Sequence, residues 1–346
     1  MDLKRLLKFY DALQDEESRK LFMIKYDMLF HKTYGDFIET LIQLDYQWKI
    51  DLYDDFRPLL KNKKVIIFGA GPDGRMTCDI LKKNKVPVYK FCDNDIKKQG
   101  KMIDGIEVIS LQDIWREQEE YFVVIASRRH AGNMLNQLME GHFPRKNIWY
   151  PRLGALYATT GQQYFDCPEM PPVGKDEVFI DVGCFDMTTS KMFAEWSGHK
   201  YRRIIAFEPD SYNYENCLKN IDIRDCELLS YAAWGRGEEL CFSSAGSGSN
   251  VFGTEGKRVK AESIDHVLNG ERATFIKMDV EGAELKVLEG TESTIKKYKP
   301  RLAICIYHKP DDIYRIPLLL MDYRDDYKFY IRHYTSCSYE TVLYAV

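Results

Sequence analysis

The 346-residue sequence lacks several patterns that would define a protein class at once. No run reaches the roughly 18 apolar residues of a membrane-spanning helix, and the charged N-terminal stretch lacks the sustained apolar segment of a secretion signal. Lysine and arginine (49) do not outnumber aspartate and glutamate (53), so the net charge of -4 offers no basic excess for nucleic acid. These absences predict a cytoplasmic protein with no membrane span and no nucleic-acid partner.

The nine cysteines are scattered and form no C-x-x-C pair that would bind a metal or act in redox chemistry. Cys184 and Cys305 stand inside apparent core strands, as reduced buried thiols do in cytosolic proteins. The sequence also has no G-x-S-x-G elbow of a serine hydrolase, no internal repeat and no low-complexity tract. Neither the cysteines nor a serine-hydrolase motif therefore indicates the chemistry of this protein.

The most informative stretch is a strand–turn–helix–strand unit at residues 177–210. Its two apolar runs end at Gly183 and at Glu208-Pro209-Asp210, and open α/β sheets bind ligands at such carboxyl edges. Gly183 lets the backbone approach a ligand closely. Glu208, about 27 residues beyond Asp181, is where such units hold ribose hydroxyls. The alternative is an ordinary parallel-sheet unit with incidental acids.

A third strand edge, at residues 275–284, places Lys277, Asp279, Glu281 and Glu284 around one turn. Together with Phe179-Ile180-Asp181-Val182-Gly183, Ala206-Phe207-Glu208-Pro209 and Ser263-Ile264-Asp265, this edge resembles the FkbM family of S-adenosylmethionine-dependent methyltransferases. The resemblance covers roughly residues 163–346, and the 276–284 stretch is its specific part.

This resemblance implies a class I methyltransferase sheet of seven strands ending in an antiparallel hairpin, with S-adenosylmethionine as cofactor. Small Ala232 and Ala233, at the end of a third strand over 227–234, would leave room for adenine. Many relatives have glycine where this chain has Met187, so we expect a narrower space around the methionine moiety. The predicted cofactor residues are Asp181, Gly183, Cys184, Phe185, Asp186, Thr188, Thr189, Glu208, Pro209, Ala232, Ala233 and Asp279.

For catalysis, a hydroxyl acceptor needs a base or a metal, because it barely ionises at neutral pH. His308 is the predicted general base, since imidazole titrates near neutral pH. Asp279, Glu281, Glu284 and Lys277 would position the base or the substrate. Structural roles are the alternatives: a helix cap for Asp279, helix-dipole complementation for the glutamates and an ion pair for Lys277. If a metal such as Mg²⁺ is bound, Asp279, Glu281 and His308 are its predicted ligands.

Residues 63–150 predict a second α/β unit with a glycine-rich turn. Gly69, Gly71 and Gly74 have the spacing that places an anion at a helix N-terminus, and Arg75 and Arg128 are candidate phosphate partners. The stretches 93–100 and 105–109 resemble the N-terminal nucleotide-sugar-binding domains of bacterial sugar acyltransferases. A purely structural domain and a dinucleotide site are the alternatives. The predicted ligand residues are Gly69, Gly71, Gly74, Arg75, Asp93 and Asp95.

We therefore expect three parts: a helical segment (1–60), a Rossmann-like nucleotide- or nucleotide-sugar-binding domain (61–154) and an FkbM-type methyltransferase domain (155–346). In the helical segment, Leu3, Leu6, Leu7, Tyr10 and Leu13 form an apolar stripe that predicts core, with a homo-oligomerisation arm or a lid over a neighbouring site as the functional alternatives. The Gly/Ser-rich stretch 242–256 predicts either a flap over substrate or a passive loop.

The predicted function is O-methylation of a sugar, a glycan or a nucleotide-linked sugar in bacterial surface-polysaccharide or glycoprotein biosynthesis. N-methylation of an amine on a glycan is a close variant. The rival from another class is a non-catalytic nucleotide-sugar-binding protein.

Overall fold

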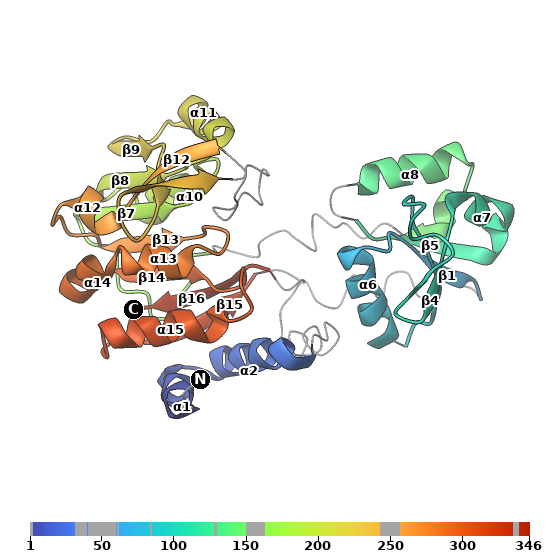
Figure 1. Ribbon diagram of the computed structural model, residues 1–346, viewed down its shortest axis with the longest axis horizontal. Helices are drawn as coiled ribbons and strands as arrows, with labels where there is room; N and C mark the ends of the chain where they lie inside the picture. The colour runs from blue at the N-terminus through green and yellow to red at the C-terminus, as the bar shows by residue number, and fades with distance from the viewer. Residues whose placement is uncertain are drawn as a thin grey trace. The chain divides into compact units, whose positions relative to one another are not determined.

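The computed structural model describes residues 3–31, 40, 60, 62–83, 85–127, 130–149, 163–242, 257–334 and 339–346. The chain forms two compact units (Figure 1). One comprises Met1–Leu29, Gly161–Tyr334 and Tyr339–Val346, and the other comprises Phe30–Thr160 and Thr335–Ser338. Both units combine helices with a largely parallel sheet, in agreement with the predicted α/β class.

The first unit is built on a seven-stranded sheet with the strand order β15-β16-β14-β13-β7-β8-β9. Five strands run parallel: β7 (Glu177–Val182), β8 (Tyr201–Phe207), β9 (Cys226–Leu229), β13 (Phe275–Met278) and β14 (Arg301–Cys305). The predicted antiparallel hairpin is formed by β15 (Phe329–His333) and β16 (Thr341–Ala345). Because the chain goes from β7 outward to β9 and then returns to β13 on the other side, the order reverses between β7 and β13. Open α/β sheets bind ligands at such a switch point.

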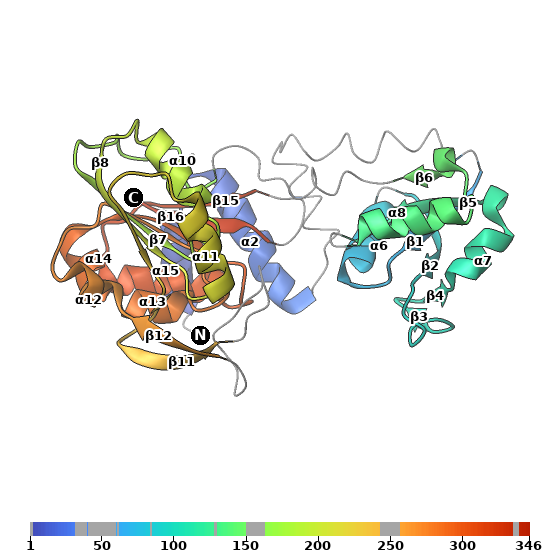
Figure 2. The same ribbon diagram turned by 90° about the horizontal axis from the view of Figure 1, so that it is seen from above.

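The central strands are largely apolar because both faces of the sheet are covered. Every residue of β7, β13 and β14 is buried. Figure 2 shows α10 (Thr188–Trp196) on one side of the sheet and α12 (Ile264–Leu268), α13 (Glu284–Glu289) and α14 (Glu292–Tyr298) on the other. The remaining helices are α11 (Ser211–Asn220) and α15 (Asp312–Tyr323).

The predicted third strand, residues 227–234, is divided in the structure. Its first part pairs with β8 as β9, whereas Ala232–Ala233 form β10. Strand β10 pairs with β12 (Lys257–Glu262), and β12 pairs with β11 (Glu238–Phe242), which gives a separate three-stranded sheet. Most of the predicted flap, residues 243–256, lies outside the described residues.

Helices α1 (Leu3–Ala12) and α2 (Glu16–His31) belong to the first compact unit. The ring of Phe9 packs against Phe22 and Phe329, with centroid distances of 5.3 and 5.6 Å. The apolar stripe differs from the predicted one, because Leu6, Phe9 and Leu13 are buried while Leu3 and Leu7 are exposed. Figure 1 shows both helices beside α15, and an Arg5–Asp322 ion pair joins α1 to that helix. These contacts make the described start of the chain, within the predicted helical segment 1–60, part of the larger unit.

The second unit has a six-stranded sheet with the order β3-β4-β2-β1-β5-β6. Its strands are β1 (Lys64–Phe68), β2 (Val88–Cys92), β3 (Met102–Ile103), β4 (Ile106–Ile109), β5 (Tyr121–Ile125) and β6 (Ile148–Trp149). Helices α6 (Pro72–Lys83), α7 (Leu111–Arg116) and α8 (Ala131–Glu140) connect them, with short 3₁₀ turns at Gln118–Glu120 and Arg145–Asn147. This order reverses between β1 and β5, which is the second switch point of the chain.

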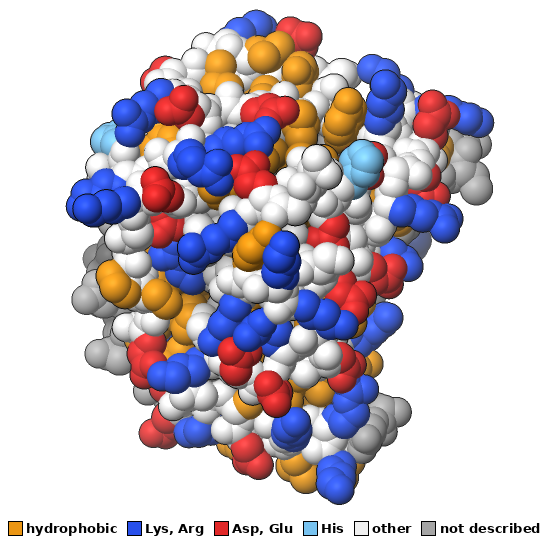
Figure 3. Space-filling model, turned by 90° about the vertical axis from the view of Figure 1, so that its left-hand side faces the viewer, with side chains coloured by type: hydrophobic (Ala, Val, Ile, Leu, Met, Phe, Trp, Pro, Cys, Tyr) orange, Lys and Arg blue, Asp and Glu red, His pale blue; other side chains and the backbone are white. Residues whose placement is uncertain are grey.

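On the face drawn in Figure 3, lysine and arginine side chains are interspersed with aspartate and glutamate. Among the described residues, no helix combines the length and apolar character needed to cross a membrane. The eight described cysteines are all free thiols.

Candidate active site

The first unit contains a cavity of about 300 Å³ at the carboxyl ends of β7, β8 and β13, the switch point of its sheet. This volume lies within the range of small-molecule sites. The structure brings together most of the predicted cofactor and catalytic residues there. The predicted residues in the wall are Gly183, Cys184, Phe185, Asp186, Thr189, Glu208, Pro209, Ala232, Ala233, Lys277, Asp279 and Glu281. Asp181, Thr188, Glu284 and His308 do not line the cavity.

Gly183 makes the close approach of strands β7 and β13 possible. Its φ of +78° lies in the left-handed region, and a Cβ atom there would stand 2.0 Å from the carbonyl oxygen of Asp279. Any side chain would therefore strain the turn and push the two strand ends apart. The glycine thus places the main chain at the wall of the cavity.

Glu208 ends β8 with its carboxylate at the cavity. One oxygen accepts the Phe185 N–H at 3.0 Å and the other accepts the Asp210 N–H at 2.9 Å. Each carboxylate oxygen has a second lone pair, so both can still accept a hydroxyl. Burial raises the pKa of Glu208 to about 7, although the Asp210 and Phe185 N–H groups lower it.

Met187 does not narrow the cavity, contrary to the expectation from the sequence. Its side chain is fully buried in a cluster with Cys184, Ala206 and Cys217, and Met187 is not among the lining residues. Met187 has a φ of +70° at the N-cap of α10, a conformation that glycine adopts without steric cost.

Lys277 and Asp181 form a buried ion pair beneath the turn of Gly183. The Nζ atom lies 3.2 Å from Asp181 Oδ1 and donates to the Gly183 carbonyl at 2.6 Å. Ser190 Oγ donates to the other carboxylate oxygen at 2.7 Å. Burial alone would lower the pKa of Lys277, but the Asp181 and Asp279 carboxylates raise it above its ordinary value. Asp181 and Lys277 therefore support the turn, while their predicted roles in cofactor binding and catalysis stay predictions.

His308 follows β14 and faces three carboxylates. Its Nδ1 atom is 2.7 Å from Glu284 Oε1, and its Nε2 atom is 3.4 Å from Asp279 Oδ1 and 3.6 Å from Glu281 Oε2. Burial lowers the pKa of His308, but the Glu284 hydrogen bond and the three negative charges raise it to about 9. A ring that is protonated at neutral pH cannot accept a proton, so this charge environment argues against the predicted general-base role of His308, which stays a prediction.

Sequence reasoning missed four polar residues of the cavity wall: Tyr164, Asn213, Tyr307 and Glu340. The Tyr164 hydroxyl donates to Asp279 Oδ2 at 3.2 Å, and the Tyr307 hydroxyl is 3.5 Å from Asp279 Oδ1. Tyr307 also donates to Glu340 at 3.1 Å. Tyr164 lies in the segment 163–166, which precedes β7, and Tyr307 directly precedes His308. Glu340 carries no sequence signal, because the fold of the terminal hairpin alone brings it to the site.

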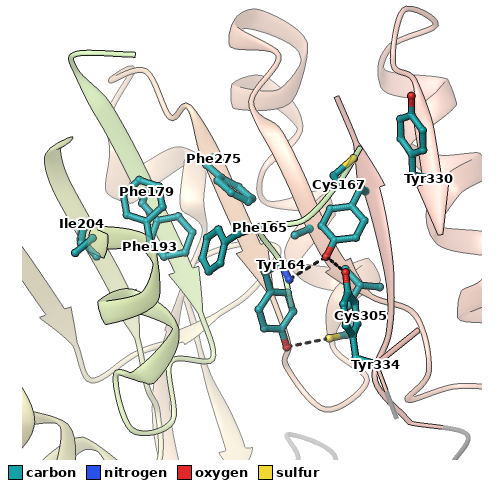
Figure 4. Packing of buried hydrophobic residues seen from close by; sticks show 14 of the residues in the cluster. Tyr164, Phe165, Cys167, Phe179, Phe193, Ile204, Phe275, Cys305, Tyr330 and Tyr334 are labelled. Atoms are coloured by element: carbon teal, nitrogen blue, oxygen red, sulfur yellow. Dashed lines mark hydrogen bonds between the residues drawn. The ribbon is translucent and has the colours of Figure 1, made fainter. Parts of the chain in front are cut away.

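The aromatic core holds Tyr164 in place. Its backbone N–H donates to the Tyr344 hydroxyl at 2.9 Å, and Figure 4 shows the neighbouring Phe165 beside the rings of Phe179 and Phe193. Those two rings stack with centroids 4.2 Å apart. The segment 163–166 is therefore packed into the core of the sheet, and this packing positions the Tyr164 side chain at the cavity wall.

The second unit has a cavity of about 360 Å³ at its own switch point. Of the predicted ligand residues, Gly69, Gly71 and Asp93 line it, whereas Gly74, Arg75 and Asp95 do not. Asp93 Oδ2 accepts the Ala70 N–H at 2.8 Å and pairs with Lys98 at 3.0 Å. Further lining residues include Asn94, Ser127 and His130. Arg128 lies outside the described residues.

Two of the predicted residues of this unit have structural roles. A Cβ atom on Gly74 would stand 1.7 Å from the Gly69 carbonyl oxygen, so this glycine lets α6 pack against the turn. The Arg75 guanidinium forms a two-pronged ion pair with Asp104, with contacts of 2.7 and 2.9 Å. Gly74 therefore allows the close packing of α6 on the turn, while the Arg75 guanidinium is paired with the Asp104 carboxylate of the same unit.

Comparison with known proteins supports the assignment of the first unit. Residues 181–339 match the model of the methyltransferase FkbM domain family, which confirms the predicted resemblance over those residues. The crystal structure of methyltransferase FkbM from Methylobacillus flagellatus KT is similar, with a TM-score of 0.52 and 16% sequence identity, and the match covers 94% of this chain and 98% of that chain. This similarity supports the fold. No curated protein matches the chain significantly.

The second unit also matches a family model. Residues 61–149 match the model of the C2185-like N-terminal domain, which does not confirm the predicted resemblance to sugar acyltransferases. UDP-D-quinovosamine 4-dehydrogenase from Vibrio fischeri shares 24% identity over 26% of this chain and 77% of that chain, with a TM-score of 0.22.

Aeropyrum pernix fibrillarin in complex with S-adenosyl-L-methionine shares 14% identity over 53% of this chain and 71% of that chain, with a TM-score of 0.36.

Proposed function

We propose that this chain is an S-adenosylmethionine-dependent methyltransferase that methylates a hydroxyl group of a sugar, a glycan or a nucleotide-linked sugar. The observation that best supports this proposal is the cavity at the switch point, where Gly183, Glu208 and Asp279 follow directly after three neighbouring strands. The residues fit the cofactor. Glu208 has free lone pairs for the ribose hydroxyls, and Ala232 and Ala233 leave a flat wall for adenine.

S-adenosylmethionine, when bound, supplies a methyl group on a sulfonium centre. The acceptor hydroxyl must be held in line with that methyl carbon and must lose its proton as the new O–C bond forms and the C–S bond breaks. The carboxylates of Asp279 and Glu281 line the cavity and are placed to accept this proton. The Tyr164 and Tyr307 hydroxyls fix the orientation of Asp279.

The part of the cavity wall around Asp279, where the acceptor would bind, favours hydroxyl donors. Glu281 and Glu340 join Asp279 in the wall there, whereas Lys277, which also lines the cavity, is already paired with Asp181. Sugar hydroxyls would donate to these carboxylates, but a phosphate group would be repelled by them. The nucleotide of a linked sugar would therefore bind away from this wall. An amine would also suit an acidic wall, which keeps N-methylation as the close variant.

The second unit would present or sense a nucleotide-linked sugar in this scheme. Its cavity at a switch point, with Gly71 in the wall and Lys98 beside Asp93, supports a small-molecule ligand there. The cellular role proposed from the sequence is cytoplasmic biosynthesis of a bacterial surface polysaccharide or glycoprotein.

Titration calorimetry on the purified full chain tests the proposal. We expect S-adenosylmethionine and S-adenosylhomocysteine to bind with micromolar Kd, about -8 kcal/mol, and one member of a panel of UDP-, CDP- and GDP-sugars to give heat independently. Folded protein that binds neither adenosyl ligand at millimolar concentration would overturn the methyltransferase proposal. Binding of a nucleotide sugar alone would then favour the non-catalytic binding protein.

A further inference from the structure

Phe185 differs from its neighbours in the turn after β7. Cys184 and Met187 are 2% and 0% exposed and belong to a buried apolar cluster, whereas Phe185 is 46% exposed. Phe185 also lines the cavity. A single exposed apolar side chain elsewhere on a surface needs no explanation. An aromatic ring in the wall of a cavity, however, offers apolar area that a ligand can cover.

The backbone of Phe185 is held in a conformation that is costly for a large side chain. Its φ of +53° lies in the left-handed region, which glycine or asparagine adopts more easily than a bulky residue does. Two hydrogen bonds fix the main chain there. The N–H donates to Glu208 Oε2 at 3.0 Å, and the carbonyl accepts the Cys217 thiol at 3.1 Å. Backbone strain of this kind is often found where ligands bind, so it points to a role for the ring.

The hydrogen bond to Glu208 indicates which part of the cofactor lies near the ring. In the proposed function, the free lone pairs of Glu208 accept the ribose hydroxyls. A hydroxyl bound to Oε2 would share that oxygen with the Phe185 N–H, and two donors bound to one oxygen lie about 5 Å apart. The side chain of Phe185 therefore begins next to the ribose site.

The other position to consider for the ring is beside the positively charged sulfur, because aromatic faces attract cations. The contacts at the methyl-transfer end favour different aromatic residues. The Tyr164 and Tyr307 hydroxyls lie 3.2 and 3.5 Å from the Asp279 carboxylate, which is placed to accept the proton of the acceptor. The main chain of Phe185 instead contacts Glu208, the acid of the ribose site.

We propose that the ring of Phe185 covers the nucleoside part of the bound cofactor, beside the ribose held by Glu208. This inference rests on the proposed function, because it takes the adenosyl cofactor as the ligand of the cavity. The phenyl ring contributes apolar contact, which strengthens binding in proportion to the area removed from water. S-adenosylmethionine and S-adenosylhomocysteine share the adenosyl group. Phe185 should therefore strengthen the binding of both ligands equally and should not distinguish a sulfonium from a neutral thioether.

The test is titration calorimetry of the full chain with S-adenosylmethionine and, separately, with S-adenosylhomocysteine. We expect Phe185→Ala to weaken both ligands by about tenfold or more, and by the same factor for each. Phe185→Tyr keeps an aromatic ring and should bind both ligands nearly as tightly as the wild type. The matched control is Tyr212→Ala, which removes a 74% exposed ring that does not line the cavity and should leave both affinities unchanged.

Urea unfolding of the unliganded variants distinguishes a ligand contact from a structural role. Because Phe185 is half exposed, Phe185→Ala should leave the unfolding midpoint nearly unchanged. A large fall in the midpoint that accompanies the loss of affinity would show that the ring stabilises the turn, and would overturn the proposed ligand contact.

The remaining outcomes separate this inference from the proposed function. Equal affinities of the wild type and Phe185→Ala would overturn the inference and leave the methyltransferase proposal intact. A loss of affinity for S-adenosylmethionine alone would also overturn it, because the ring would then lie beside the sulfonium. A folded wild-type chain that binds neither ligand would overturn the proposed function and, with it, the role of Phe185.

Discussion

Lys277 and Asp181 occupy paired positions on the adjacent strands β13 and β7, and their side chains form an ion pair that is almost completely removed from solvent. The lysine also donates to the carbonyl of Gly183, the residue that turns the chain at the cavity. The Lys277–Asp181 ion pair therefore connects strands β7 and β13 to the turn at Gly183, which forms part of the cavity wall. A buried pair of this kind is costly to break, because the remaining charge has no water to solvate it.

Replacing Lys277 with methionine should destabilise the first unit by about 3–5 kcal/mol, since Asp181 would be left charged and unpaired. Urea unfolding of the full chain measures this change. The matched control is the double variant Lys277→Met with Asp181→Asn, which removes both charges and should recover part of the lost stability. Equal destabilisation of the single and double variants would show that the ion pair is not the cause.

The turn at Gly183 gives a second prediction. In Gly183→Ala, the new Cβ would meet the Asp279 carbonyl at 2.0 Å in a backbone with φ of +78°. The strand ends must then separate, so we expect at least tenfold weaker binding of S-adenosylmethionine in calorimetry. Gly198→Ala is the matched control, because Gly198 has a φ of +60° but open space around its Cβ position. It should cost about 1 kcal/mol of stability and leave the affinity unchanged. Equal affinity losses in both variants would contradict this account.

The sequence was sufficient for the succession of the seven main-sheet strands along the chain and for most of the cavity wall. The apolar runs that end at Gly183, Glu208 and Asp279 mark strand ends, and parallel strands bring such ends to one edge. Roles that depend on side-chain direction could not be predicted. Whether Met187 points into the cavity or into the core depends on its left-handed backbone, and no pattern of residue types specifies that.

Long-range relationships were also beyond the sequence. Glu340 reaches the cavity only because the last strand inserts between β14 and β15. The protonation of His308 depends on three carboxylates, of which Glu284 was expected to serve a helix dipole or to position the base. The carboxylates around His308 in the folded chain, and not the ordinary pKa of a histidine, determine its protonation state.

Glu208 predicts a pH dependence of cofactor binding. Burial raises the pKa of this carboxyl group to about 7, so it is ionised at pH 8 and mostly protonated at pH 6. Hydrogen bonds from ribose hydroxyls to an ionised carboxylate are stronger than those to a neutral one. The Kd of S-adenosylmethionine should therefore rise by about tenfold as the pH falls from 8 to 6. Calorimetry across this range measures it.

The control for this prediction is Glu208→Gln, which keeps the shape of the side chain but cannot ionise. Its affinity should be lower at pH 8 and nearly constant with pH, and any slope it retains would reflect titration of the ligand itself. A wild-type affinity that stays flat between pH 6 and 8 would argue against a ribose contact by Glu208.

The N-terminal helices should contribute to the stability of the first unit, because Phe9 is fully buried between Phe22 and Phe329. Phe9→Ala would leave a cavity next to β15 and should cost about 3–5 kcal/mol. Hydrogen exchange localises the effect: amides of Phe329–His333 should exchange faster, because the Ile331 N–H donates to Ser18 of α2. Leu7→Ala on the same helix is the control, since Leu7 is 54% exposed and surface substitutions usually change stability by less than about 0.5 kcal/mol. Unchanged exchange in β15 of Phe9→Ala would mean that α1 and α2 do not stabilise the sheet. The oligomerisation arm predicted as an alternative would then become the better interpretation of the apolar stripe.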